Sequence, residues 1–182
     1  MLFTFAEITD MVVMTLILGY IFLRMINRGK QFDKDSFLFS CLTIAPAIIL
    51  HELGHKFTAI FFGYTAIFHA AYFWLGLGLV LAIARSPFIL FIPAYVQISC
   101  GTNCVQAPLA TSLIALAGPF VNLLLYITAL IVLKKKKDMN RKTYAFWQIT
   151  KQINLFLFIF NMLPIPRFDG SKVFSGLLKT IF

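Results

Sequence analysis

Long stretches without charge alternate with short polar or basic segments along this chain, and the uncharged stretches predict its helices. A helix that spans a bilayer needs about 20 mainly apolar residues. The segment that ends before the first basic cluster is apolar, and no charge occurs anywhere between Ser86 and Leu133. The predicted spans or parts of spans are residues 11–23, 36–50, 57–84 (uncharged apart from His69), 109–133, and 144–163 with Lys151 as its single charge.

The middle of the chain, residues 64–108, is open to two interpretations. Glycine and proline interrupt it at five places, and aromatic and β-branched residues are common in it. One interpretation is a helix over 67–84 followed by a shorter returning piece. The other is a re-entrant hairpin inside the protein, since irregular backbone is tolerated at membrane depth only where protein or water surrounds it.

The composition agrees with a membrane protein. Sixty percent of the 182 residues are hydrophobic and 13% are charged, and 21 of them are Phe. Soluble domains are roughly 45–50% apolar and about 25% charged. Disorder, a collagen-like repeat and an ordinary cytosolic enzyme are therefore excluded, and we expect a multi-pass protein of the cell membrane.

Basic residues gather in two linkers, Asn27–Asp35 and Lys134–Lys142, and give most of the net charge of +9. They are not interleaved with aromatic residues along a soluble face, so we expect no nucleic-acid partner. The lipid bilayer is the expected surrounding. The positive-inside rule places both linkers in the cytoplasm, with the N-terminus outside.

The three cysteines do not form a disulfide framework. Cys41 is expected to pack as a small hydrophobic residue. Cys100 and Cys104 could pair or help to bind metal, although the usual zinc spacing of two intervening residues is absent. No cleavable signal peptide is evident at the N-terminus.

The chemistry is concentrated in His51-Glu52-Leu53-Gly54-His55, a His-Glu-x-x-His motif. On a helix, positions i and i+4 share one face, so both imidazoles can bind a single zinc ion. Glu52 then lies beside the metal and can take a proton from water. Ionisable residues inside a span are costly to bury and are functional by default.

A catalytic zinc site needs a third protein ligand, for which the chain offers few residues. Asp33, Asp35 and Asp138 lie in the linkers, and Glu7 and Asp10 are expected to cap or flank the first helix. His69 is a rival candidate. Asp169 follows Pro164 and Pro166 and precedes Gly170, so it lies where a helix must break, and a carboxylate at a break at membrane depth suits a metal ligand.

Three ordered motifs together resemble the site-2 protease family of intramembrane zinc metalloproteases. They are the His51–His55 motif, the Gly-Pro-x-x-Asn element Gly118–Asn122, and the Asn-x-x-Pro-x-Pro-x-x-Asp-Gly element Asn161–Gly170. The resemblance covers roughly residues 37–175. Extra C-terminal spans and a PDZ-like or nucleotide-sensing segment are not found in the sequence.

The resemblance implies a role for each matching residue. His51, His55 and Asp169 would ligate one zinc ion per chain, and Glu52 would be the general base. Asn161 would hold the substrate backbone or the developing oxyanion, and Asn122 would contact substrate or hydrogen-bond between helices. It also implies a metal site toward the cytosolic side, which would put Asn27–Asp35 outside, opposite to the positive-inside inference.

The expected fold is therefore an all-α polytopic membrane protein, with one membrane domain over residues 1–182. About four to six transmembrane helices are expected, with a re-entrant β-hairpin region and a broken helix at the metal site. Its parts would be a helix with the His-Glu-x-x-His motif (36–63), the re-entrant or hairpin region (64–108), a helix with the Gly-Pro-x-x-Asn element (109–133) and a broken helix (144–175).

The expected function is hydrolysis of peptide bonds within or near the transmembrane segments of membrane-protein substrates. The alternative is a catalytically inactive zinc-binding membrane protein with a structural or adaptor role. An ion transporter with a broken helix is a weaker option, because no matching pair of interrupted segments marks an inverted repeat.

Overall fold

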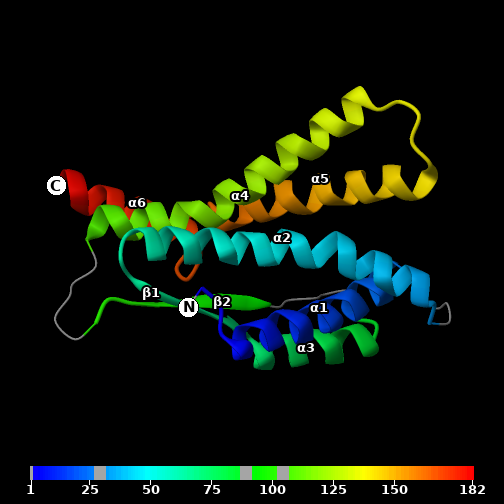
Figure 1. Ribbon diagram of the computed structural model, residues 1–182, viewed down its shortest axis with the longest axis horizontal. Coiled ribbons are helices and arrows are strands. Elements are labelled where there is room, and N and C mark those ends of the chain that lie inside the picture. Colours follow the sequence, from blue (N-terminus) through cyan, green and yellow to red (C-terminus); the bar gives the residue numbers. More distant parts are fainter. Residues whose placement is uncertain (1, 27–31, 87–91, 102–106) are drawn as a thin grey trace. The chain divides into compact units, whose positions relative to one another are not determined.

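The computed structural model describes residues 2–26, 32–86, 92–101 and 107–182. The described residues form six helices and two strands (Figure 1). In chain order these are α1 (Phe5–Ile26), α2 (Lys34–Phe61), β1 (Thr65–Ala70), α3 (Tyr72–Ile83), β2 (Ala94–Ser99), α4 (Pro108–Lys135), α5 (Arg141–Asn161) and α6 (Asp169–Ile181). Cys104, Arg28 and Lys30 lie outside the described residues.

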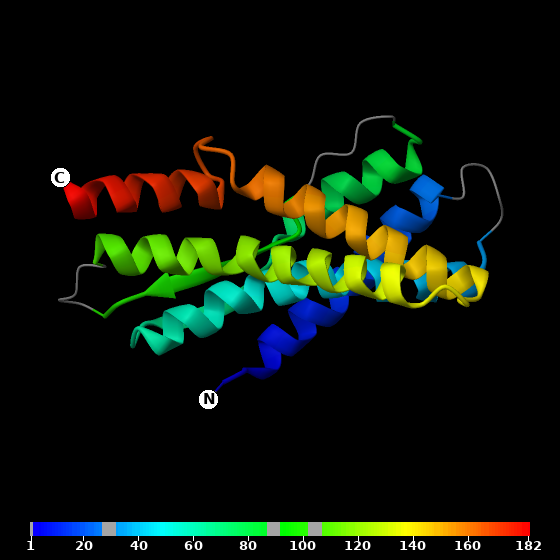
Figure 2. The ribbon, with the colours of Figure 1, turned by 90° about the horizontal axis from the view of Figure 1, so that it is seen from above.

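These elements belong to two compact units. The first comprises Met1–Ile49 and Phe68–Tyr95, and in it α1 packs against α3. The second comprises Leu50–Ile67 and Val96–Phe182, and in it α4 packs against both α5 and α6 (Figure 2). All three predicted sequence motifs fall in the second unit.

Three described helices are long and apolar enough to cross a membrane: Phe5–Met25, Lys34–Phe61 and Pro108–Lys135. This is fewer than the four to six spans expected. The predicted span over 144–163 does form a helix, α5, but that helix is not one of the three. Its first half carries polar side chains such as Gln148, Lys151 and Gln152, which lower its hydropathy.

The helix ends follow local capping rules. Thr4 and Glu7 form a reciprocal capping box at the start of α1, with Glu7 Oε2 accepting the Thr4 N–H at 2.8 Å and Thr4 Oγ1 accepting the Glu7 N–H at 3.3 Å. Asn140 caps α5 by accepting the Thr143 N–H at 2.8 Å. The expectation that Glu7 caps the first helix is confirmed.

The region 64–108 combines features of both sequence interpretations. It contains a helix, α3, between two strands that pair with each other in an antiparallel sheet. The Thr65 hydroxyl lies 2.7 Å from that of Ser99, and the Ala71 N–H donates to the Pro93 carbonyl at 3.1 Å, so both pairs are in one register.

Carboxylates of α1 cover the outer edge of β1. In this register the N–H groups of Phe68 and Ala70 point away from β2. Glu7 Oε1 accepts the first at 2.8 Å and Asp10 Oδ2 accepts the second at 3.0 Å. Within the described residues the sheet has two strands, so no third strand pairs with the outer edge of β2.

The predicted helix over 144–175 is broken, as expected. α5 ends at Asn161 and α6 begins at Asp169. The connection contains Pro164 and Pro166, and Arg167 has a φ of 79°. A beta-carbon on Gly170 would lie 2.4 Å from the carbonyl oxygen of Met162, so only glycine allows this close return of the chain.

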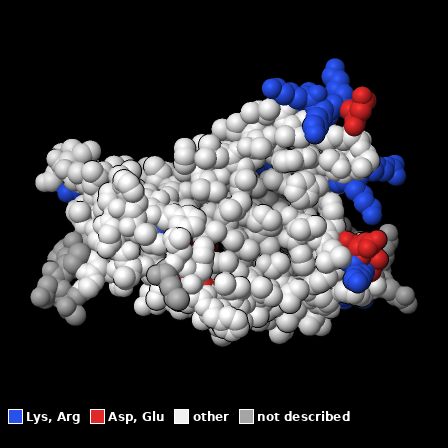
Figure 3. All heavy atoms as spheres, in the orientation of Figure 1, with Lys and Arg blue, Asp and Glu red and all other residues white. Residues whose placement is uncertain are grey.

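Basic side chains gather at the turn between α4 and α5 (Figure 3). The second basic linker therefore lies at one end of an apolar helix, where an aqueous boundary is expected. Its exposed basic residues are Lys134, Lys135, Lys136, Lys137, Arg141 and Lys142.

Candidate metal centre

The helical spacing of the His-Glu-x-x-His motif brings two imidazoles together. His51 and His55 lie one turn apart on α2, and both are buried. Their rings meet edge to face with centroids 4.8 Å apart, and their Nε2 atoms are 3.1 Å apart. The two nitrogens therefore face the same point.

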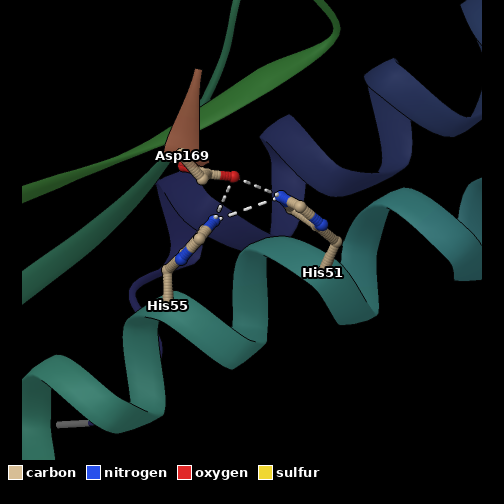
Figure 4. A group of neighbouring side chains, drawn as sticks. All are labelled: His51, His55 and Asp169. Atoms are coloured by element: carbon tan, nitrogen blue, oxygen red, sulfur yellow. Dashed lines mark hydrogen bonds and ion pairs between the residues drawn. The ribbon is translucent and has the colours of Figure 1, made fainter. Parts of the chain in front are cut away.

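Asp169 joins this pair from the start of α6 (Figure 4). Its Oδ2 atom lies 3.2 Å from His51 Nε2 and 3.3 Å from His55 Nε2. The break in the chain before α6 places the carboxylate here, because a continuous helix would have carried residue 169 further along its axis. Residues 118 positions apart thus share one site.

The three donor atoms have the spacing that zinc requires. Bonds of about 2.0–2.1 Å in tetrahedral geometry place ligand atoms roughly 3.3 Å from one another. The measured separations are 3.1, 3.2 and 3.3 Å. Two imidazoles and a carboxylate also form a donor set known from catalytic zinc sites. The residues present therefore fit this metal.

Carbonyl oxygens hold both rings from behind. His51 Nδ1 lies 2.5 Å from Asn122 Oδ1, and His55 Nδ1 lies 2.7 Å from the backbone oxygen of Ile114. A carbonyl oxygen only accepts, so in the neutral ring each Nδ1 carries the hydrogen. Each Nε2 is then a free lone pair directed at the site, as a metal ligand must be.

Glycines let α4 approach α2 closely. A beta-carbon on Gly54 would lie 2.8 Å from the carbonyl oxygen of Ala117. One on Gly118 would lie 2.4 Å from His55 Nε2 and 2.8 Å from His51 Nε2. The glycine of the Gly-Pro-x-x-Asn element therefore leaves the space in front of the two donor nitrogens open.

Known proteins carry the same relationship. The profile of peptidase family M50 matches residues 132–182. The candidate zinc metalloprotease MJ0611 of Methanocaldococcus jannaschii is 33% identical over 172 residues, which are 94% of this chain and 84% of that protein. The chain belongs to peptidase family M50, the site-2 protease family.

A second M50-like relative matches a smaller part. The candidate zinc metalloprotease YwhC of Bacillus subtilis is 33% identical over 78 residues, which are 38% of this chain and 36% of that protein. No solved structure matches the chain significantly.

In this M50 chain Glu52 is buried next to the three donors without being one of them. Its charged neighbours are the imidazoles of His51 and His55, the carboxylate of Asp169 and the ammonium of Lys172. Sequence reasoning did not single out Lys172. Its place three residues after Asp169 on α6 puts it on the same helix face, which is a signal that the sequence contained.

The rival third ligand, His69, has other partners. His69 Nδ1 lies 3.9 Å from Asp10 Oδ2, and its ring packs on Tyr95 with centroids 5.5 Å apart. Within the described residues the group of potential metal ligands consists of His51, His55 and Asp169.

The two predicted substrate-binding asparagines differ in their surroundings. Asn161 is the last residue of α5 and is partly exposed, and its amide has no hydrogen-bond partner in the described part of the chain. Asn122 is fully buried and hydrogen-bonds to His51 and to Asn154. Sequence reasoning missed Asn154, although a polar side chain inside an apolar stretch is a recognisable signal.

Proposed function

We propose that this M50 chain is an intramembrane zinc metalloprotease that hydrolyses peptide bonds within or next to transmembrane segments of other membrane proteins. The convergence of the three donor atoms beside the buried Glu52 carries this proposal. A structural zinc site usually has four protein ligands, whereas a catalytic one has three and keeps a position open. The described residues supply three.

One zinc ion per chain is the proposed cofactor, held by His51, His55 and Asp169. When bound, zinc polarises the scissile carbonyl and activates water for attack near neutral pH. The buried polar side chains around it would form the wet pocket that hydrolysis needs within a bilayer.

Glu52 is the proposed general base. One of its carboxylate oxygens takes a proton from the attacking water while the carbon–oxygen bond forms. The same group then passes the proton to the amide nitrogen while the carbon–nitrogen bond breaks. A carboxylate that ligates metal could not do this freely, so its place beside the ligand group supports the role.

Asn161 is proposed to bind the substrate backbone or the developing oxyanion. Its unpartnered amide and its place just before the break in the chain support this role. For Asn122 we favour support of His51, because its side-chain oxygen and nitrogen are both already in hydrogen bonds.

The setting of this chemistry is proposed to be the cell membrane, with the lipid bilayer around a multi-pass protein. The three long apolar helices and the membership of the M50 family support this location. A membrane protein with a transmembrane segment is the proposed substrate, and no nucleic acid is involved.

Strand addition at β2 is the proposed means of holding a substrate extended. The N–H groups of Val96 and Ile98 point away from β1 in the observed register. Their side chains pack against a cluster that includes Ile114, whose backbone oxygen holds His55. A substrate strand added at this edge would gain backbone hydrogen bonds close to the metal centre.

Val96→Pro is expected to slow cleavage about 2-fold to 10-fold relative to Val96→Ala, as the loss of one backbone hydrogen bond predicts. Proline removes an outward N–H, which an edge strand tolerates without losing its pairing to β1. Cleavage rates and zinc content of both variants would be measured in bilayer nanodiscs. Equal rates for the two variants would rule out strand addition at this edge.

Glu52→Gln tests the proteolytic function itself. The amide is the same size as the carboxylate but takes no proton, so we expect cleavage to fall about 10²-fold to 10⁴-fold while zinc stays bound. Single-span reporter proteins in nanodiscs would serve as substrates, and zinc would be counted by metal analysis. A wild-type protein that binds zinc but cleaves no reporter, or a variant as active as the wild type, would favour a non-proteolytic zinc protein.

A further inference from the structure

A chain of buried amides runs from the metal centre into α5. Asn122 on α4 and Asn154 on α5 are both fully buried. The side-chain nitrogen of Asn122 donates to the side-chain oxygen of Asn154 at 2.8 Å. The side-chain nitrogen of Asn154 in turn donates to the backbone oxygen of Thr150, also at 2.8 Å.

The far end of this chain fixes the direction of every bond in it. A backbone carbonyl only accepts, so Asn154 must present its nitrogen to Thr150 and its oxygen to Asn122. Asn122 must then present its nitrogen to Asn154 and its oxygen to His51. The His51 ring is therefore held with its hydrogen on Nδ1, and Nε2 is left as a lone pair.

Loss of the acceptor at Asn154 would release this order. The Asn122 amide could then turn over and offer its NH₂ group to His51 Nδ1. A neutral ring that accepts at Nδ1 carries its hydrogen on Nε2, where it points at the metal site and blocks ligation. His55 is not exposed to this change, because its Nδ1 donates to the backbone oxygen of Ile114.

We propose that Asn154 is a positioning residue that sets the ring tautomer of His51 through Asn122. The proposal rests on zinc binding by His51 in the proposed function above. A polar group that merely joins α4 to α5 would stabilise the fold, but it would not change the position of a hydrogen on a ring that it does not touch.

The first measurement is made on metal-free protein with ¹⁵N-labelled histidine, at a pH where the imidazoles are neutral. The chain has three histidines, so six ring nitrogens must be assigned. We expect His51 to carry its hydrogen on Nδ1 in the wild type and to shift toward Nε2 in Asn154→Leu. The His55 signals should not change in the variant, which also reports that the second unit is folded.

Two further variants separate positioning from simple packing. Asn154→Asp in its protonated form can make both hydrogen bonds of the asparagine, and we expect it to keep the wild-type tautomer. Ser112→Ala removes another buried hydrogen bond of the second unit, from the Ser112 hydroxyl to the Val173 carbonyl, and should leave His51 unchanged. A His51 tautomer that is the same in wild type and Asn154→Leu would overturn the proposal.

Zinc affinity, measured by competition with a chelating dye, provides the second readout. We expect Asn154→Leu to weaken binding about 10-fold to 100-fold, as is usual for groups that orient metal ligands. In an Asn122→Asp background the loss should be much smaller, because a carboxylate presents an acceptor to His51 however it turns. An equal loss in both backgrounds would show a packing role and would contradict the proposal.

The tautomer measurement also distinguishes this proposal from the proposed function. A wild-type protein that binds no zinc but shows the expected tautomer shift would refute the metalloprotease and support the relay. A protein that binds zinc and cleaves reporters, but shows no shift in Asn154→Leu, would support the protease and refute the relay.

Discussion

Asp169→Ala is expected to abolish zinc binding and, with it, any proteolysis. Asp169 Oδ2 is the single carboxylate oxygen that meets both imidazole nitrogens within the described residues. Two histidines alone leave a zinc ion with half of its usual four ligands. Metal analysis of detergent-purified protein should give about one zinc per chain for the wild type and close to none for the variant.

His69→Ala is the matched control for this experiment. His69 is the third histidine of the chain and the rival ligand, but the structure pairs it with Asp10 and Tyr95. We expect its removal to leave the zinc content near that of the wild type. Zinc lost from His69→Ala and retained in Asp169→Ala would mean that the third ligand is misassigned.

The local part of the metal centre could be predicted from the sequence because helix geometry determines it. Four residues separate His51 from His55, and a helix places such positions on one face whatever surrounds it. The break before Asp169 was equally legible, since Pro164 and Pro166 cannot continue a hydrogen-bonded helix.

Bringing Asp169 to the histidines is a different matter. They are 118 positions from Asp169 along the chain for His51, and no periodicity specifies which of several carboxylates or His69 returns to them. The resemblance to a family supplied that information. The local sequence offered only a carboxylate at a broken helix.

Long-range pairing explains most of what the sequence did not reveal. The strands β1 and β2 pair across an intervening helix, so no hairpin turn announces them. Glu7 and Asp10 were expected at the start of a helix, and their hydrogen bonds to the edge of β1 depend on tertiary structure. Asn154 likewise acquires a role only once α4 and α5 lie side by side.

The number of spans was overestimated for a compositional reason. Residues 144–163 have one full charge, which suggested a span, but uncharged polar residues also make insertion into lipid costly. α5 places its polar residues in its first half, and Asn154 among them is buried against α4 instead of facing outward.

Gly118→Ala is expected to lower zinc affinity by at least about 100-fold, more than the loss of a group that only orients a ligand. The added methyl carbon would lie 2.4 Å from His55 Nε2 and 2.8 Å from His51 Nε2, closer than a beta-carbon is found to any heavy atom. Either the two imidazoles move apart or α4 moves away from α2. Both movements disrupt donor atoms that now lie 3.1 Å from each other.

Gly76→Ala provides the matched control, since it makes the same chemical change in a helix. A beta-carbon on Gly76 would have no neighbour within 4 Å, and alanine favours a helix by up to about 1 kcal/mol over glycine. We expect normal zinc content in this variant. Normal zinc affinity in Gly118→Ala as well would show that the site tolerates a methyl group, and the geometry in Figure 4 would then be wrong.

The expected failure of Gly118→Ala also gives a physical reason for the spacing of the Gly-Pro-x-x-Asn element. Gly118 and Asn122 lie four residues apart, so α4 presents both on one face toward the same pair of rings. Glycine leaves room in front of the Nε2 atoms, and the asparagine oxygen holds His51 from behind at Nδ1. One helix face therefore both opens the metal site and orients one of its ligands, and a side chain at either position larger or less polar than the native one should reduce zinc affinity.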